Sequence, residues 1–349
     1  MKEVFQISSK IVTCYFDEAF NEVQTLYPDT TIIYVTDENI IEAHADKFQS
    51  QQVIVVKAGE KFKQQSTVDY IVEQLIILKA DRQTLLVGVG GGVVTDITGY
   101  TASVYMRGIR FGFVPTTILA MVDAAIGGKN GVDVGIYKNL VGCIKQPDFL
   151  IYDYIFLQTL PKEEWINGFA EIIKHAAIKD ADLFSTLQKN SIENYRSSIQ
   201  ALNELIRQNV KIKMTVVAED EFEKGDRKLL NFGHTLGHAI ENIYLLPHGS
   251  AISIGMAAAA KLSNEMNDFS SENFYDLKKL LQQYHLPVQK EVDAGKIWEV
   301  LLMDKKKLGD GIQFVVLDKI GQAKTITLPT STLELFFKNY FKSGETLTT

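Results

Sequence analysis

Short apolar runs alternate with helical patterns up to about residue 155. The run TIIYVTDENI ends in polar turn residues, and QVIVVKAGEKFK repeats that design. STVDYIVEQLIILKA follows with helical periodicity and Ser66 as its expected N-cap. The segment QTLLVGVG predicts another strand before a glycine cluster and a helix, and IRFGFVPTT and DFLIYDY have the composition of buried strands. This alternation predicts a mainly parallel sheet covered by helices.

The pattern changes after LQTLPKEEW, where Pro161 suits the first turn of a helix. Helical periodicity then continues to about residue 300, and strand patterns return only at GIQFVVL and AKTITL. We therefore expect an α/β domain over residues 1–157 and a mainly helical domain over residues 158–349.

Composition narrows the class of protein. The chain has 349 residues, of which 46% are hydrophobic and 23% charged, as in ordinary folded proteins. A net charge of −7 without a basic tract argues against a nucleic-acid partner. Two cysteines, Cys14 and Cys143, suit a reducing compartment, and no apolar run approaches the roughly 20 residues of a membrane-spanning helix. The N-terminus also lacks the pattern of a signal peptide, so these features predict a cytoplasmic protein that does not span a membrane.

The glycine cluster in VGVGGGVVTD is the first candidate site, since the chain leaves a strand there and enters a helix. Glycines let backbone N–H groups approach phosphate oxygens, and a helix N-terminus favours their negative charge. The dinucleotide fingerprint G-x-G-x-x-G is absent, because Val93 stands where its last glycine would be. A tight turn without ligand is the alternative. Four glycines, at positions 88, 90, 91 and 92, favour phosphate binding.

A second candidate is VPTTILAMVDAAIGGKNGVDVGIYKNLVG, which combines an apolar core-like stretch with polar side chains. Its glycines predict a loop, and loops with several charged residues often build sites. A solvated surface loop explains KNGVD equally well, so the residues leave both interpretations open. The polar candidates are Thr116, Thr117, Asp123, Lys129, Lys138 and Asn139.

The helix WINGFAEIIKHAAIKD places Glu171, Lys174 and His175 at i, i+3 and i+4, near one face. Apolar neighbours on that face indicate that Glu171 points inward, where a carboxylate needs a cation or a metal. A surface Glu–Lys pair is the alternative.

Three of the six histidines, His234, His238 and His248, lie in NFGHTLGHAIENIYLLPHGS. His234 and His238 are one helical turn apart and could clamp a metal from one helix face. Alternatively, two of the three imidazoles could join Glu171 in a His₂Glu site with an open position. A pair with structural hydrogen bonds remains a third possibility, and spacing does not choose among them.

A charged segment, KIKMTVVAEDEFEKGDRKLLNFGH, directly precedes these histidines. An exposed charge run is the ordinary interpretation, but its position beside the histidine helix also fits a substrate-binding loop. Its polar residues include Lys213, Glu219, Asp220, Glu221, Glu223, Arg227 and Asn231.

Taken in order, these motifs resemble the 3-dehydroquinate synthase family over nearly the whole chain. The resemblance is carried by GEKFK, GGGVVTD, YMRGI, VPTTILAMVDAAIGGK, YKNLVG, LPKEEWINGFAEIIK, DEFEKGDRKLLNFGHTLGHAIE, HGSAISIGM and DKK. It implies a Rossmann-like N-terminal domain that binds NAD, a helical C-terminal domain and a divalent metal, zinc or cobalt. Thr95 departs from the family, which more often has glycine there.

The resemblance also implies roles for individual residues. The metal ligands would be Glu171, His234 and His248. The cofactor would contact Asp37, Glu60, Lys63, Gly91, Gly92, Val93, Val94, Thr95, Asp96, Thr116, Thr117, Lys129, Lys138, Phe156, Leu157, Gln158 and Thr159. Substrate and catalytic contacts would come from Arg107, Asp123, Lys129, Asn139, Lys174, Lys213, Glu223, Arg227, Asn231 and His238, and from Lys305 or Lys306.

The implied reaction converts 3-deoxy-D-arabino-heptulosonate 7-phosphate to 3-dehydroquinate and phosphate. It proceeds by transient oxidation with NAD, β-elimination, reduction and intramolecular aldol closure, and the family suggests a homodimer. A sister sugar-phosphate cyclase making another cyclitol, a metal-dependent polyol dehydrogenase and a non-catalytic cofactor-binding protein are the alternatives. Retention of Glu171, both histidine ligands and the Arg227/Asn231 pair favours the synthase.

Overall fold

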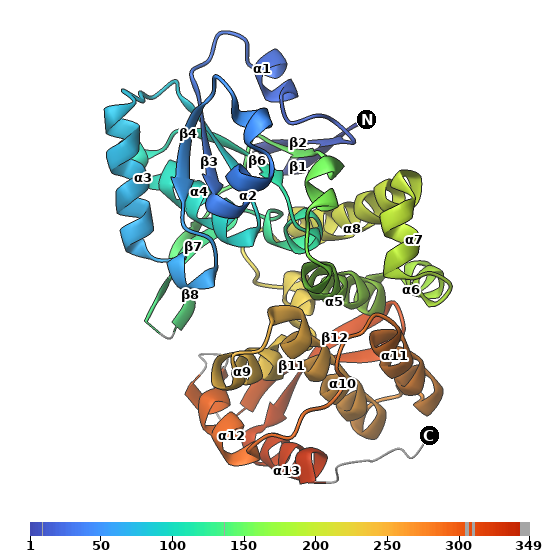
Figure 1. Cartoon of the computed structure of the whole chain (residues 1–349). Helices are drawn as coiled ribbons and strands as arrows, with labels where there is room; N and C mark the ends of the chain where they lie inside the picture. Colours follow the sequence, from blue (N-terminus) through green and yellow to red (C-terminus); the bar gives the residue numbers. More distant parts are fainter. Residues whose placement is uncertain (9, 136, 304–306, 309–310, 343–349) are drawn as a thin grey trace. The chain divides into compact units, whose positions relative to one another are not determined.

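The computed structural model describes residues 1–8, 10–135, 137–303, 307–308 and 311–342, which form two compact units (Figure 1). The first unit comprises Met1–Gly168 and Ser198–Phe222, and the second comprises Phe169–Ser197 and Glu223–Thr349. This division differs from the expected boundary between residues 157 and 158. The observed boundary lies between Gly168 and Phe169, within the helix Lys162–Lys179, and Ser198–Phe222 belongs to the first unit.

A seven-stranded sheet in the order β1-β2-β9-β6-β5-β3-β4 forms the centre of the first unit. Its members are β1 (Lys2–Ile7), β2 (Lys10–Phe16), β3 (Ile32–Asp37), β4 (Gln52–Val56), β5 (Leu85–Gly90), β6 (Arg110–Pro115) and β9 (Phe149–Tyr152). All neighbours pair in parallel except β1 and β2, which form an antiparallel hairpin at one edge. The expected mainly parallel sheet is therefore confirmed.

The helices of the first unit are α1 (Glu22–Leu26), α2 (Glu38–Ala43), α3 (Gln65–Ile77), α4 (Gly92–Val104) and α8 (Ile199–Glu219). Short helical turns add η1 (Ala45–Phe48), η2 (Glu60–Phe62), η3 (Tyr105–Arg107), η4 (Ala120–Ala124) and η5 (Tyr154–Gln158). The expected N-cap at Ser66 is wrong. The N-cap of α3 lies two residues earlier, at Gln64, which makes no side-chain hydrogen bond to the helix.

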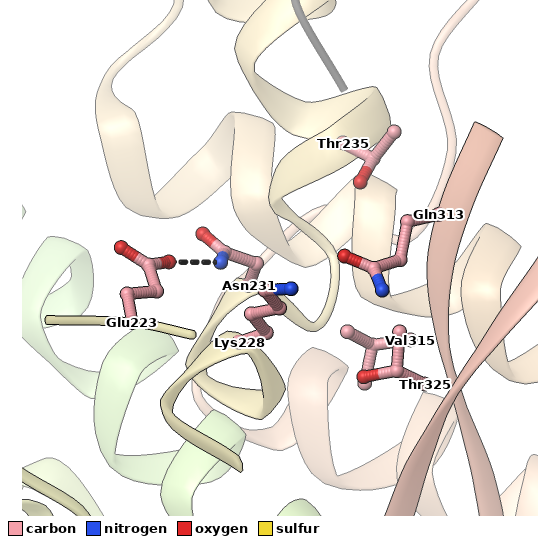
Figure 2. A pocket seen from close by; sticks show the side chains of 7 residues that line it. All are labelled: Glu223, Lys228, Asn231, Thr235, Gln313, Val315 and Thr325. Carbon is pink, nitrogen blue, oxygen red and sulfur yellow. Dashed lines mark hydrogen bonds between the residues drawn. The ribbon is translucent and has the colours of Figure 1, made fainter. Parts of the chain in front are cut away.

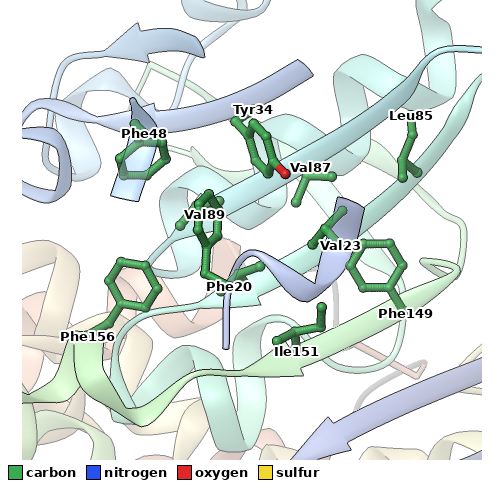
Figure 3. Close-up of a cluster of buried hydrophobic side chains, with 11 residues drawn as sticks. Phe20, Val23, Tyr34, Phe48, Leu85, Val87, Val89, Phe149, Ile151 and Phe156 are labelled. Carbon is green, nitrogen blue, oxygen red and sulfur yellow. The ribbon is translucent and has the colours of Figure 1, made fainter. Parts of the chain in front are cut away.

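Aromatic and β-branched side chains build the core against the sheet (Figure 3). Phe20 packs against Tyr34, Phe48 and Phe156 with ring centroids 4.9–6.2 Å apart. Such aromatic pairs add to the free energy gained by burying apolar surface. The complete cluster is Phe20, Val23, Tyr34, Phe48, Leu85, Val87, Val89, Val114, Phe149, Ile151 and Phe156.

The segment expected to be a loop forms a two-stranded antiparallel hairpin instead, β7 (Lys129–Val134) with β8 (Tyr137–Ile144). Gly131 pairs with Gly142, and a Cβ atom on Gly131 would lie 2.5 Å from the carbonyl oxygen of Val141. Glycine is therefore required here by the close approach of two strands. The loop prediction was wrong because glycine can mark either situation.

The second unit is mainly helical, as expected. Its helices are α5 (Lys162–Lys179, which starts in the first unit), α6 (Ala181–Gln188), α7 (Ile192–Ser197), α9 (His234–Tyr244), α10 (His248–Met266), α11 (Ser271–Gln283), α12 (Ala294–Met303) and α13 (Thr330–Lys342). A small antiparallel sheet joins β10 (Lys307–Leu308), β11 (Gly311–Lys319) and β12 (Gln322–Pro329), and the turn η6 (Asp226–Asn231) leads into α9. Within the described ranges, no helix is both long and apolar enough to cross a membrane.

Candidate functional site

Three helices of the second unit bring one carboxylate and two imidazoles together. Glu171 comes from α5, His234 is the first residue of α9 and His248 is the first residue of α10. The Glu171 Oε1 atom lies 3.5 Å from Nε2 of His234 and 3.3 Å from Nε2 of His248. Glu171 is completely buried, and its other carboxylate oxygen forms an ion pair with Lys174.

The second nitrogen of each imidazole is also engaged. Nδ1 of His234 lies 3.1 Å from the carbonyl oxygen of Phe232, and Nδ1 of His248 lies 3.3 Å from Oε2 of Glu241. A carbonyl oxygen only accepts hydrogen bonds, so Nδ1 of His234 carries the proton and its Nε2 presents a lone pair. A carboxylate behind a histidine is also the usual support of a metal ligand.

Sequence reasoning missed Glu241. A signal was present, because His234, His238 and Glu241 stand at i, i+4 and i+7 and share one face of α9. A carboxylate in that register is a candidate partner for any imidazole packed against the same face.

Burial and charge set the protonation of the two imidazoles in opposite directions. Burial and the nearby Lys174 hold the pKa of His234 well below its usual value, so this ring is neutral. Burial also lowers the pKa of His248, but Glu171 and Glu241 outweigh it and raise the pKa to about 9. A metal ion at Nε2 of His248 must therefore displace a proton.

The donor set fits a divalent metal. A neutral His234 aims an Nε2 lone pair at a carboxylate oxygen, an unfavourable contact that a cation between the two atoms would make favourable. The 3.3 and 3.5 Å separations match the distance of about 3.3 Å between two ligands of a tetrahedral zinc ion. His238, Glu241 and His248 form an overlapping group, and no group in the described part of the chain contains both His234 and His238.

A small pocket of the second unit holds two of the residues expected to contact substrate (Figure 2). Asn231 Nδ2 donates to Glu223 Oε1 over 2.6 Å, and Figure 2 shows the two side chains pointing toward one another. The pocket has a volume of about 140 Å³, and its lining residues are Glu223, Lys228, Asn231, Thr235, Gln313, Val315 and Thr325. Arg227 lies on the same turn η6 and is almost completely buried.

In the first unit, the glycine cluster connects β5 to α4 as expected. A Cβ atom on Gly90 would lie 2.6 Å from the Val94 side chain, so part of the glycine enrichment has a packing cause. Gly91 is the N-cap of α4 and offers no side chain to the first backbone N–H groups of the helix. The hydroxyl of Thr95 bonds back to the carbonyl oxygens of Gly91 and Gly92, and its side chain is buried.

Lys63 connects three of the segments expected to bind the cofactor. Its Nζ atom lies 2.5 Å from Asp96 Oδ2 on α4 and 2.6 Å from Asn139 Oδ1 on β8. Burial lowers the pKa of Lys63, but Asp96 outweighs burial and raises it, so the lysine stays charged.

Asp123 and Lys213, both expected to meet the substrate, form an ion pair within the first unit. Lys213 Nζ lies 2.7 Å from Asp123 Oδ1 and 2.5 Å from the Asp123 carbonyl oxygen. The pair joins η4 to α8, a helix that groups with the first unit rather than with the helices that surround it in sequence.

The remaining expected residues differ in exposure. Phe156 and Leu157 are buried, whereas Gln158 and Thr159 are exposed. Among the described residues Arg107 has no hydrogen bond or ion pair and is exposed. Glu60, Lys129 and Lys138 are exposed, Val93 is half-buried and Thr116 is buried. Thr117 Oγ1 accepts a hydrogen bond from the backbone N–H of Ala120, the first residue of η4, and Asp37 caps α2. Lys305 and Lys306 lie outside the described residues.

Comparisons with known proteins show the family of this chain. Two family models match, 3-dehydroquinate synthase N-terminal over residues 53–167 and 3-dehydroquinate synthase C-terminal over residues 168–307. The chain belongs to the 3-dehydroquinate synthase family. Its family relatives include 3-dehydroquinate synthases of Campylobacter concisus (38% identity, 87% of this chain and 89% of the relative) and Saccharolobus solfataricus (39% identity, 90% and 91%). The synthase of Enterococcus faecalis is 36% identical over 93% of this chain and 94% of its own.

Solved structures of other enzymes share the fold. A 2-deoxy-scyllo-inosose synthase complexed with carbaglucose-6-phosphate, NAD⁺ and Co²⁺ matches with a TM-score of 0.85 and 27% identity, over 97% of this chain and 100% of that chain. A protein of Sinorhizobium meliloti described as a probable glycerol dehydrogenase matches with a TM-score of 0.67 and 13% identity, over 96% of this chain and 98% of that chain. This match shows a shared fold only.

Proposed function

We propose that this chain catalyses the 3-dehydroquinate synthase reaction, converting 3-deoxy-D-arabino-heptulosonate 7-phosphate to 3-dehydroquinate and phosphate. The family membership supports the reaction, and the buried cluster of Glu171, His234 and His248 is the structural observation that carries it. As a lyase of aromatic biosynthesis, it would act on a small phosphorylated keto acid.

Glu171, His234 and His248 would hold the metal, leaving a coordination position open for substrate. His238 would face substrate from the same helix as His234. This assignment is supported by the lone pair that His234 aims at Glu171 and by the absence of any described group that contains both His234 and His238. Lys174 would hold the second oxygen of Glu171 and keep the carboxylate oriented.

The cofactor would be NAD⁺, bound by the first unit. The related 2-deoxy-scyllo-inosose synthase contains NAD⁺ and Co²⁺, which supports both a dinucleotide and a divalent ion here. When bound, NAD⁺ would accept and return one hydride, and the metal would polarise the reacting hydroxyl group. The Lys63–Asp96 ion pair and the first turn of α4 would form part of the binding surface.

Substrate would contact the remaining polar residues. Arg107, Lys129, Asn139, Lys213 and Arg227 provide cationic and amide donors suited to a phosphate and a carboxylate. Asp123 and Glu223 would keep Lys213 and Asn231 oriented through the 2.7 and 2.6 Å contacts that the structure shows. Either Lys305 or Lys306 would add a further cation.

One assay tests the proposal. The purified protein receives the heptulosonate phosphate, NAD⁺ and Zn²⁺, and phosphate release is followed together with absorbance in the NADH band. We expect phosphate release without net NADH, because the hydride returns to the substrate. Accumulation of NADH on a simple polyol, without phosphate release, would show a dehydrogenase and overturn the proposal.

A sister sugar-phosphate cyclase is the second candidate, favoured by the TM-score of 0.85 to 2-deoxy-scyllo-inosose synthase. Glucose 6-phosphate, of which carbaglucose-6-phosphate is a carbocyclic analogue, discriminates between the two. Phosphate release from glucose 6-phosphate, and not from the heptulosonate phosphate, would select the sister activity. A homodimer, a cytoplasmic location and the lack of a nucleic-acid partner stay predictions, and light scattering checks the first.

A further inference from the structure

A histidine outside the expected site holds the segment of residues 156–159. His44 is the C-cap of α2, and its ring packs edge-on against Phe156 with centroids 4.8 Å apart. Its Nε2 atom lies 2.8 Å from Oγ1 of Thr159, which in turn lies 3.3 Å from the carbonyl oxygen of Phe156. The carbonyl oxygen can only accept, so the hydroxyl donates to it and accepts a hydrogen bond from Nε2–H of His44.

The hydrogen bond from His44 holds Thr159, one of the few side chains of residues 156–159 that a ligand could contact. Phe156 and Leu157 turn their side chains into the core, whereas Gln158 and Thr159 are exposed. A ligand over this segment would therefore meet its backbone and the side chains of Gln158 and Thr159. His44 restricts the rotamer of Thr159 and aims the remaining lone pair of its hydroxyl.

The surroundings of His44 favour one protonation state of its imidazole, so the hydrogen bond to Thr159 keeps one direction. The side chain is 8% exposed, and burial together with Lys47 lowers the pKa of its imidazole, so the ring carries a single proton near neutral pH. Lys47, on the adjoining turn η1, lies 3.3 Å from Asp153 Oδ2 and over the Phe156 ring at 5.4 Å. The segment 153–159 is thus held at several points by residues that follow α2.

The opposite end of α2 carries Asp37, whose Oδ1 accepts from the backbone N–H groups of Asn39 and Ile40 at 3.0 Å. Asp37 is also expected to contact the cofactor. A helix of six residues therefore connects two separate segments expected at the cofactor, one at each end.

We propose that His44 is a positioning residue for NAD⁺, acting through the hydroxyl of Thr159. The proposal rests on the proposed function, because the cofactor role of residues 156–159 comes from the family. The ordinary alternative is a core histidine with a satisfied hydrogen bond and no effect on the cofactor.

The dissociation constant of NAD⁺ for the full-length, zinc-loaded protein tests this, measured by titration calorimetry. Thr159→Val removes the hydroxyl at nearly constant shape, and His44→Phe removes the donor but keeps an aromatic ring against Phe156. Each variant should raise the dissociation constant about three- to tenfold, the value of one neutral hydrogen bond. The double variant should be no weaker than the worse single variant, because both remove the same interaction.

His44→Gln keeps an N–H donor and should retain affinity within about twofold. Thr25→Val, at an exposed threonine of α1, is the matched control and should bind as the unmodified protein does. At saturating NAD⁺ the variants should recover kcat, whereas a general loss of structure would lower kcat at every concentration.

The possible outcomes separate the two proposals. If the unmodified protein binds NAD⁺ and Thr159→Val binds it equally well, the positioning role is wrong and the proposed function stands. If the unmodified protein does not bind NAD⁺, the proposed function itself fails. Should His44→Phe not fold, unchanged binding of NAD⁺ by Thr159→Val would still refute the proposal.

Discussion

Glu241 gives the sharpest test of the metal site, through the variant Glu241→Gln. Its carboxylate contacts Nδ1 of His248 at 3.3 Å and is only 7% exposed, so solvent screens the interaction little. Loss of such a supporting carboxylate typically weakens metal binding about 10- to 100-fold. The glutamine keeps the shape and an acceptor oxygen, so the variant removes the charge alone.

Two features of the structure place the expected effect at the lower end of that range. The 3.3 Å contact is longer than the roughly 2.8 Å of a strong charge-assisted hydrogen bond. Removing the charge also lowers the pKa of His248, which weakens the competition of its proton with the metal. We expect about a tenfold loss of zinc affinity, equivalent to about 1.4 kcal/mol.

Competition with a chelator of known zinc affinity measures this effect at fixed pH, and elemental analysis gives the stoichiometry. Glu265→Gln is the matched control, since this half-exposed glutamate lies at the far end of α10 in a surface pair with Lys261. An unchanged affinity in Glu241→Gln would refute the supporting role. Complete loss of zinc would instead make Glu241 a direct ligand, in the overlapping group with His238 and His248.

Three further predictions address the ligands, the cofactor side and the fold. His248→Ala should lose zinc and activity together, whereas His238→Ala should keep zinc and react more slowly. Elemental analysis of both variants checks this. A zinc-free His238→Ala variant would show that His234 and His238 are the metal ligands instead. Lys63→Met should lower the free energy of unfolding by about 2 kcal/mol, because it removes the ion-pair partner of the Asp96 carboxylate, whose side chain is 16% exposed. A loss below about 1 kcal/mol in urea denaturation contradicts this. Gly131→Ala should lower the free energy of unfolding by about 1–3 kcal/mol, since its Cβ would lie 2.5 Å from the carbonyl oxygen of Val141. An unchanged melting temperature would show that the two strands of the hairpin can move apart without loss of stability.

Much of the architecture follows from local pattern. Strands β3, β5, β6 and β9 and helices α3 and α4 lie where the apolar runs and helical periodicity predicted them. The grouping of α8 with the first unit could not be foreseen, because an amphipathic pattern shows that one face is buried but not what buries it. The Asp123–Lys213 contact between η4 and α8 joins residues ninety positions apart.

The metal cluster shows the same limit. Periodicity on α5 predicts that Glu171 faces inward, and the structure confirms that it is buried. Spacing offers His234 with His238 as one possible pair but does not choose it, because spacing reports neighbours within one helix. It cannot show that the first residue of α10 lies beside the first residue of α9. The family resemblance supplied His248 for this reason. Neither residue spacing nor the family resemblance identified Glu241, whose contact with His248 is seen only in the structure.

The two carboxylates around His248 also determine the net charge that the site presents to an approaching anion. Without a metal, the charges of Glu171 and Glu241 are balanced by Lys174 and by the proton that the raised pKa of His248 retains. A divalent ion that displaces this proton leaves one positive charge in excess. Metal loading would thus turn an electrically neutral cluster of side chains into a cationic one, so that an oxyanion is attracted only by the form of the protein able to react with it.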